Sequence, residues 1–256
     1  MTRLLEVCVE DAGGLRPAVE GGAQRIELCS ALPVGGITPS AAMISAAAQL
    51  PIPVHVLVRP RAGDFVYDSV EQDLIAADIR SVVAAGLAGL VIGASRRDLT
   101  LDTALLEQQI DIAREAAARR GTSISLALHR AFDVCPDPLE ALEAAIKLGF
   151  ERILTSGGAV SAMAGRPVLG ALVKHARGRI KILAASGINA GNVHEILATG
   201  VDEIHASCQV PRSRPDSKVI QLGFEQKESR RIAASEVSAL ASAIAAWCSQ
   251  PSSSPR

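Results

Sequence analysis

The sequence predicts an α/β protein folded as a single (β/α)8 barrel of the TIM type. Short aliphatic and β-branched runs recur about every 30 residues, and each precedes a segment with apolar side chains at helical spacing. Eight such units occupy most of the 256-residue chain without a linker-like change in composition. Aromatic residues make up only 2% of a chain that is 48% hydrophobic, which favours an aliphatic α/β interior over an all-β sandwich.

The eight expected strands are short, rich in Val, Ile and Leu, and followed by turn residues. They are Leu4–Val9, Arg25–Cys29, Pro53–Arg59, Leu90–Gly93, Ser123–Arg130, Arg152–Ser156, Lys181–Ala185 and Glu203–Ser207. No Gly-x-Gly-x-x-Gly pattern follows the first strand. A closed barrel is therefore favoured over an open dinucleotide-binding sheet.

The intervening segments repeat apolar residues every three to four positions, which indicates helices with one buried face. The clearest sets are Leu74, Ile75, Ile79, Val82 and Val83; Leu139, Leu142 and Ile146; and Val193, Ile196 and Leu197. Helix ends are expected at glycines that can adopt a left-handed conformation. These glycines are Gly86, Gly121, Gly149 and Gly200.

Helix starts are expected where a capping side chain precedes a proline or an apolar run. Thr38 and Asp137 each precede a proline, and Asp102 and Asn189 are further candidates for capping residues. These signals complete the alternation of strand and helix that the barrel requires.

We expect one domain over residues 1–249 and a disordered tail over residues 250–256. Two connections are unusually long, Pro60–Ser69 and the Arg- and Lys-rich Gln209–Arg231. Connections of this size serve as lids or binding loops, or are surface excursions.

The charge balance excludes large anionic partners. The chain has 26 Lys and Arg residues against 27 Asp and Glu residues, so we expect neither nucleic-acid nor membrane binding. The amino terminus has no apolar signal segment, and no apolar run approaches the roughly 20 residues that span a bilayer. Five unpaired-looking cysteines favour a cytoplasmic protein with reduced thiols.

Polar side chains are expected inside the barrel, because strand residues alternate between the helix-facing and the axis-facing side. The inward-facing set comprises Glu6, Cys8, Glu27, Cys29, His55, Leu57, Arg59, His129, Glu203, His205 and Ser207. A purely structural barrel fills these layers with aliphatic residues. Two interpretations follow: an ion-pair network that only fixes the register, or a functional site at the carboxyl ends of the strands.

Several loop residues extend the candidate site. Asp133 lies just after the fifth strand and is a candidate carboxylate at the barrel mouth, or a turn residue. Ser156 and Gly157 follow the sixth strand, and Ser186 and Gly187 follow the seventh. Small residues here allow backbone N–H groups to approach an anion, the usual phosphate position of such barrels, although glycines after strands also serve simply as turns.

Cys8 and Cys29 occupy equivalent positions on adjacent strands. Two thiolates at one height of the barrel would suit Cu(I) better than harder divalent ions. The alternative is that both cysteines act as small buried hydrophobic residues. The absence of C-x-x-C and H-E-x-x-H patterns argues against a structural or hydrolytic zinc site.

The chain resembles the CutC family of copper homeostasis proteins. The resemblance rests on ordered motifs: Leu5–Cys8, Arg25–Cys29, Gly35–Ser40, Pro53–His55, Arg59–Arg61, Gly63–Phe65, His129–Asp133 and Leu154–Gly157. It extends from the first strand to about His205 and implies a TIM-like barrel, a cytoplasmic location, a homo-oligomer and copper handling by cysteine thiols. It implies no particular reaction, and the Gln209–Arg231 connection aligns least well.

Three functions remain open at this stage. The first is a cytosolic copper protein that binds Cu(I) through Cys8 and Cys29. The second is an enzyme for a small anionic metabolite, a phosphorylated sugar or a carboxylate. Its expected residues are Glu27 or Glu6 as general base, His129 or His55 as acid, Arg59 as anion clamp, and Ser186 and Gly187 as anion seat, with Asp133 and His205 in the same site. The third is an assembly scaffold.

Overall fold

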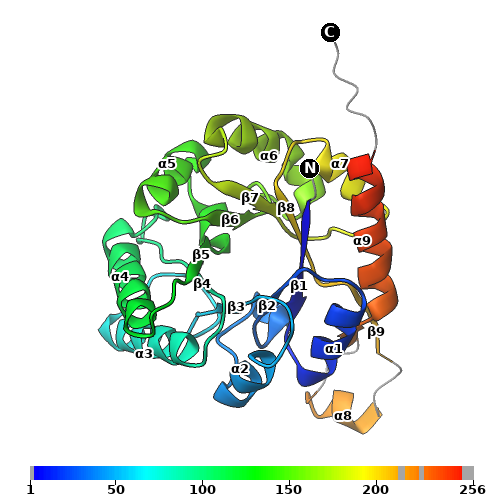
Figure 1. The fold of residues 1–256 in the computed structure, drawn as a ribbon, viewed down its shortest axis with the longest axis horizontal. Helices are drawn as coiled ribbons and strands as arrows, with labels where there is room; N and C mark the ends of the chain where they lie inside the picture. The colour runs from blue at the N-terminus through cyan, green and yellow to red at the C-terminus, as the bar shows by residue number, and fades with distance from the viewer. Residues whose placement is uncertain (1–2, 213–216, 225–227, 250–256) are drawn as a thin grey trace.

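The computed structural model of the chain describes residues 3–212, 217–224 and 228–249 and shows a closed eight-stranded parallel barrel (Figure 1). The strands follow one another in chain order around the barrel: β1 Leu4–Val9, β2 Arg25–Leu28, β3 Val54–Leu57, β4 Gly89–Ile92, β5 Ser125–Leu128, β6 Arg152–Thr155, β7 Lys181–Ala184 and β8 Glu203–Ala206. The pairing of β1 with β8 closes the barrel and places Glu6 opposite His205. The predicted (β/α)8 architecture is confirmed.

Helices form the outer ring around the strands (Figure 1). The helices of this ring are α1 Ala12–Glu20, α2 Ala41–Ala47, α3 Ser69–Ala84, α4 Thr103–Arg119, α5 Pro138–Leu148, α6 Ala162–Ala176, α7 Val193–Leu197 and α9 Ala234–Ser249. The short α8, Ser217–Gln221, lies outside the ring. Short 3-10 turns span Leu32–Val34 and Arg130–Val134. The expected disordered tail, residues 250–256, lies outside the described residues.

The main hydrophobic core lies between the barrel and the helices, as strand alternation predicts. Val7, Ile26 and Val56 are fully buried on the outward faces of β1, β2 and β3 and belong to this core. Cys8, Cys29 and Leu57 instead form a separate small cluster inside the barrel with Val91 and Ala127. The predicted division of strand residues into two faces is therefore confirmed.

Most of the helix-boundary predictions are confirmed. The side chains of Asp102 and Asp137 accept hydrogen bonds from the first-turn amides of α4 and α5. The four glycines predicted to end helices all have positive φ angles: Gly86, Gly121, Gly149 and Gly200. At these positions glycine avoids the steric cost that a side chain would add.

Two predicted helix starts are wrong. Helix α2 is capped by Ser40, because Thr38 instead exchanges hydrogen bonds with the backbone of Arg59. Helix α7 begins after Asn192, because the Asn189 side chain accepts from Gly191 N–H in a local turn. In both cases the side chain predicted to cap the helix forms a different hydrogen bond instead.

The described part of the long connection after β8 contains secondary structure. Strand β9 (Gln209–Pro211) pairs in antiparallel fashion with β10 (Arg230–Ile232), and α8 lies between them. Strand β10 contacts α1 on the outside of the barrel. Among the described residues, no helix is both long and apolar enough to cross a membrane.

Candidate functional site

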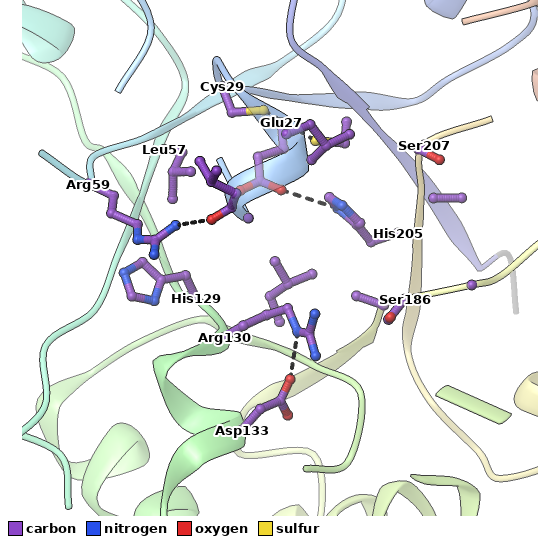
Figure 2. Close-up of a pocket in the computed structure, with 18 of the residues that line it drawn as sticks. Glu27, Cys29, Leu57, Arg59, His129, Arg130, Asp133, Ser186, His205 and Ser207 are labelled. Carbon is purple, nitrogen blue, oxygen red and sulfur yellow. Dashed lines mark hydrogen bonds and ion pairs between the residues drawn. The ribbon is translucent and has the colours of Figure 1, made fainter. Parts of the chain in front are cut away.

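A cavity of about 490 Å³ opens at the carboxyl ends of the strands, where TIM-type barrels carry their sites. Figure 2 shows Arg59 and His129 on one side of it and His205 and Ser186 on the other. Of the residues predicted for the site, those lining the cavity are Cys8, Glu27, Cys29, Arg59, His129, Asp133, Ser186, Gly187 and His205. Glu6, His55, Ser156 and Gly157 lie outside the cavity lining.

A buried ion-pair network lies deeper in the barrel. The Arg25 guanidinium donates to both Glu6 and Glu203, and Arg152 Nε lies 3.1 Å from a Glu203 oxygen. The charge of Arg25 and the hydrogen bond from His205 outweigh the effect of burial and hold the pKa of Glu6 well below its usual range. Glu6 and Glu203 are thus ion-paired, as the pairing interpretation expects, with Arg25 and Arg152 as the main cations.

These two arginines were not among the residues predicted to face the barrel axis. Each stands at the first position of its strand and next to an outward-facing isoleucine, Ile26 or Ile153. The alternation that placed the glutamates inside also places both arginines inside. That signal was present in the pattern.

His205 links this buried network to the cavity, because it contacts both Glu6 and Glu27. His205 Nδ1 lies 2.8 Å from Glu6 Oε1 and 3.4 Å from Glu27 Oε2. Burial alone would lower the pKa of His205, but the hydrogen bond with Glu6 and the charge of Glu27 together raise it. Burial raises the pKa of Glu27 to about 7, because its neighbours stabilise the carboxylate less than water would.

The two cysteine thiols meet as predicted. Cys8 Sγ and Cys29 Sγ are 3.5 Å apart, and both residues are at least 97% buried. The hydrogen bond with Cys29 and burial raise the pKa of Cys8 well above its usual value. Ligand atoms of Cys8, Glu27 and His205 lie within 4.8 Å of one another, which makes these residues a candidate metal centre.

His55 and His129 are held against glycines of the neighbouring strand β4 or its end. A Cβ atom added to Gly89 would lie 2.4 Å from the His55 ring, and one added to Gly93 would lie 2.3 Å from the His129 ring. Burial lowers the pKa of each histidine to about 3, so both rings are neutral at pH 7. His129 Nδ1 also accepts a hydrogen bond from Ala131 N–H.

Arg59 connects two loops at the cavity wall. Its terminal nitrogens donate to the carbonyl oxygens of Val34, Gly36 and Gly63 at 2.7–2.9 Å. The guanidinium also lies 5.0 Å from the centre of the Phe65 ring. These contacts fix the loops that follow β2 and β3 beside the cavity.

Asp133 fills the anion position predicted at Ser156 and Gly157. Its carboxylate accepts hydrogen bonds from Ser156 N–H at 3.1 Å and from Gly158 N–H at 3.0 Å. Gly157 N–H donates to the Thr155 hydroxyl, and Arg130 Nε lies 2.7 Å from the Asp133 carboxylate. The chain thus supplies its own carboxylate to the loop after β6.

The loop after β7 receives no such carboxylate from the residues that the structure describes. Ser186 and Gly187 have φ angles of 83° and 72° and line the cavity together with Ile188. Positive φ angles at both residues bend the chain sharply here, and backbone N–H groups in turns can bind anions.

Comparison with known proteins identifies the family. The family model for CutC matches residues 3–210. A CutC family protein from Agrobacterium fabrum is 52% identical over 223 residues, which cover 86% of each chain. One from Sinorhizobium medicae is 46% identical over 238 residues and covers 93% of this chain and 94% of its own.

Solved structures agree. The CutC protein from Streptococcus agalactiae, whose name refers to copper homeostasis, is 33% identical with a TM-score of 0.74 and covers 81% of this chain and 99% of its own. Thiamine phosphate pyrophosphorylase from Pyrococcus furiosus is 17% identical with a TM-score of 0.56, a likeness of fold alone, and covers 96% of each chain. On the family match and the sequence identities together, the chain belongs to the CutC family.

Proposed function

We propose that the protein binds Cu(I) as cargo through the thiolates of Cys8 and Cys29. The observation that carries the proposal is the 3.5 Å separation of the two buried sulfurs at the cavity. Metal–thiolate bonds of about 2.3 Å put two sulfurs on one ion roughly 3.8 to 4.6 Å apart, so a small side-chain rotation suffices. Soft sulfur donors favour Cu(I) over harder divalent ions.

His205 is the imidazole suited to complete such a site. The hydrogen bonds and ion pairs of its ring all involve Nδ1, which faces Glu6 and Glu27, so Nε2 is left for a ligand. Histidines that bind metals commonly donate their other ring nitrogen to a carboxylate, and Glu6 provides it here. Both thiols must lose their protons, so copper affinity rises with pH.

An anaerobic titration with Cu(I) tests this proposal. We expect the reduced protein to bind one ion per chain and the Cys8→Ser/Cys29→Ser variant to lose that binding. Cys135→Ser is the matched control, because Cys135 packs at the edge of the core and does not line the cavity. Equal affinity and stoichiometry in the double variant, with its thermal unfolding unchanged, would reject these ligands.

The second candidate function is acid–base catalysis on a small anionic metabolite. Its specific support is Glu27, a cavity-lining carboxyl group whose pKa of about 7 suits proton transfer at neutral pH. Glu6 is less suited because Arg25 holds it as a carboxylate, and His55 lies outside the cavity lining.

Deuterium exchange tests the catalytic candidate. We expect the protein in D2O to exchange a carbon-bound proton next to the carboxylate of a substrate-like acid, and Glu27→Gln to lower that rate by about a hundredfold or more. Nuclear magnetic resonance follows the loss of the proton signal. A broad panel of carboxylates and phosphorylated acids without exchange would contradict catalysis.

We also propose a cytoplasmic location and a homo-oligomeric state. All five cysteines are free thiols, which suits a reducing compartment. Val70 and Leu74 stand one turn apart on α3 with 65% and 53% of their surface exposed, as an interface between copies would require.

A further inference from the structure

Arg59 is a buried cation at the cavity wall with no counter-ion among the described residues. The residue is 4% exposed, and every partner of its terminal nitrogens is a neutral carbonyl oxygen. Its Nε–H has no acceptor in the part of the chain that the structure describes. Burying an unpaired charge costs free energy, so an anion bound beside this guanidinium would stabilise the protein.

The neighbours of Arg59 do not supply that anion. The side chains that act on its pKa are Tyr67, by charge and by a side-chain hydrogen bond, and Arg61, by charge. Burial raises the pKa of Tyr67 to about 12, so its phenol is neutral at pH 7. Arg61 is itself a cation, and it is paired with Asp64 and Glu71.

Glu27 pairs with His205, whose Nδ1 lies 3.4 Å from Glu27 Oε2. The charges that act on its carboxyl group are those of His205, Glu6 and Arg25, not that of Arg59. Arg130, the other arginine of the cavity lining, already pairs with Asp133. The positive charge of Arg59 is therefore left for a ligand.

The loop after β7 offers uncommitted amides to the same cavity. In the described chain, the N–H groups of Ser186, Gly187 and Ile188 donate to no acceptor. The other polar atoms of Ser186 are engaged, since its hydroxyl donates to Val160 O and its carbonyl accepts from Ala162 N–H. Figure 2 shows Ser186 across the cavity from Arg59.

The adjacent loop shows which acceptor such amides bind. After β6, the amides of Ser156 and Gly158 bind the carboxylate of Asp133. The loop after β7 lies beside it in the barrel but receives no carboxylate from the described chain. A carboxylate or phosphate of a ligand could accept hydrogen bonds from the amides after β7, as Asp133 does from the amides after β6.

We propose that the cavity binds a small organic dianion, with one acidic group on the amides of Ser186, Gly187 and Ile188 and the other facing Arg59. The acidic groups are carboxylates or phosphates, the chemistry that both amide clusters and guanidinium groups recognise. A cavity of about 490 Å³ accommodates a metabolite of this size. The inference rests on the proposed functions in one respect, that this cavity is the functional site. It requires neither copper binding nor catalysis.

Calorimetric titration at low ionic strength tests the proposal, with succinate, 3-phosphoglycerate and butyrate as probes. We expect either or both dianions to bind and butyrate, with one carboxylate, to bind at least about tenfold more weakly. The two dianions separate a preference for carboxylate from one for phosphate. Arg59→Gln should weaken dianion binding at least about tenfold, because it removes the charge.

Arg61→Gln is the matched control. Arg61 is two residues away, carries the same charge and lies outside the cavity lining, so its replacement should leave binding unchanged. Because Arg59 also holds two loops, amide resonances of the wild-type protein give a second measurement. Dianion addition should shift the signals of Ser186, Gly187 and Ile188 more than that of Gly158, whose amide is already bonded.

Two outcomes would overturn the proposal: no dianion binding by the wild-type protein, or binding that leaves these three amide signals unmoved. Dianion binding that persists in Cys8→Ser/Cys29→Ser and in Glu27→Gln would support it even if copper binding and proton exchange both fail. Conversely, copper binding without dianion binding would reject this inference and leave the first proposed function intact.

Discussion

Glu6 and Glu27 show how the same residue type acquires opposite properties one strand apart. Both carboxyl groups are at least 96% buried. Glu6 receives the Arg25 guanidinium and His205, which keep it ionised. Among the described residues, Glu27 has a single and longer ion pair, with His205, so burial dominates and its pKa rises to about 7. The sequence predicted both as inward carboxylates, but their ionisation depends on side-chain contacts that alternation does not specify.

The raised pKa of Glu27 predicts a pH-dependent stability. Its folded-state pKa exceeds the unfolded value of about 4.3, so ionising Glu27 opposes folding as the pH rises from about 4.3 to 7. Glu27→Gln removes this penalty. We expect its free energy of unfolding at pH 8 to exceed that of wild type by on the order of 3–4 kcal/mol, and the gain to vanish below about pH 4. Urea denaturation of the metal-free proteins measures both; a gain independent of pH would contradict the assignment.

Arg25 is predicted to be the residue on which the buried network depends most. Arg25→Met leaves Glu6 and Glu203 with weaker partners and should cost about 3–5 kcal/mol at pH 7. Because the folded-state pKa of Glu6 is lowered, its stabilising effect is present above about pH 4.3 and declines as the pH falls further, so the deficit should narrow in acid.

Arg16→Met is the matched control for Arg25→Met. Arg16 pairs with Glu20 on the surface with its side chain 85% exposed, and its loss should cost less than about 1 kcal/mol. Urea denaturation compares the two variants. Equal effects would show that the Arg25 network contributes no more than a surface ion pair.

At the scale of elements, the glycines of strand β4 and its end allow histidine rings of the neighbouring strands to pack closely against the backbone. Gly89 starts the strand and Gly93 follows it, and each leaves the space that a histidine ring from β3 or the end of β5 occupies. From the sequence, Leu90–Gly93 was predicted only to be a strand. It could not assign the glycines, because the fit of one strand against the next depends on register.

Gly89→Ala is predicted to destabilise the barrel by about 1–3 kcal/mol through overlap with the His55 ring. In a double-mutant cycle, His55→Ala should remove most of that cost, with a coupling energy of at least about 0.5 kcal/mol. Gly170→Ala in α6 is the control: its new Cβ would meet no atom closer than 3.9 Å, so it should be neutral or stabilising by up to about 1 kcal/mol. Additive effects of Gly89→Ala and His55→Ala would contradict the steric account.

Element types were more predictable than the hydrogen bonds at their ends. The caps at Asp102 and Asp137 followed from local sequence, because the acceptor and its amides lie within three residues. Thr38 failed because its partner, Arg59, is 21 residues away. Asp133 was recognised as a site residue, but its binding to amides more than 20 residues downstream required the structure.

At the scale of the whole molecule, repetition made the barrel predictable. Eight strand–helix units are enough to indicate closure, and alternation then assigns each strand residue to the helix layer or the axis. Alternation places Cys8 and Cys29 on the axis side of adjacent strands, but the register sets Cys8 opposite Glu27, so the contact of its sulfur with that of Cys29 required the structure. Two other features depend on loop conformation, which periodicity does not encode. Arg59 donates hydrogen bonds to three carbonyl oxygens, and the amides after β7 have no acceptor among the described residues.

The proposed homo-oligomer predicts a solution mass. Light scattering after size-exclusion chromatography should give an integer multiple, two or greater, of the 26.6 kDa chain mass. If α3 forms the interface, Val70→Glu/Leu74→Glu should shift the mass toward that of one chain, because two charges would replace an exposed apolar pair. Wild type at 26.6 kDa across a concentration series would contradict the oligomer.

The most direct test of the account is anomalous X-ray diffraction from crystals of the reduced protein loaded anaerobically with Cu(I). We predict one strong copper peak per chain at the inner end of the cavity, within about 2.3 Å of both Cys8 Sγ and Cys29 Sγ. The same crystals of Cys8→Ser/Cys29→Ser should lack it. A copper peak at other residues, or one retained in the double variant, would contradict the central claim that this thiol pair is the copper site.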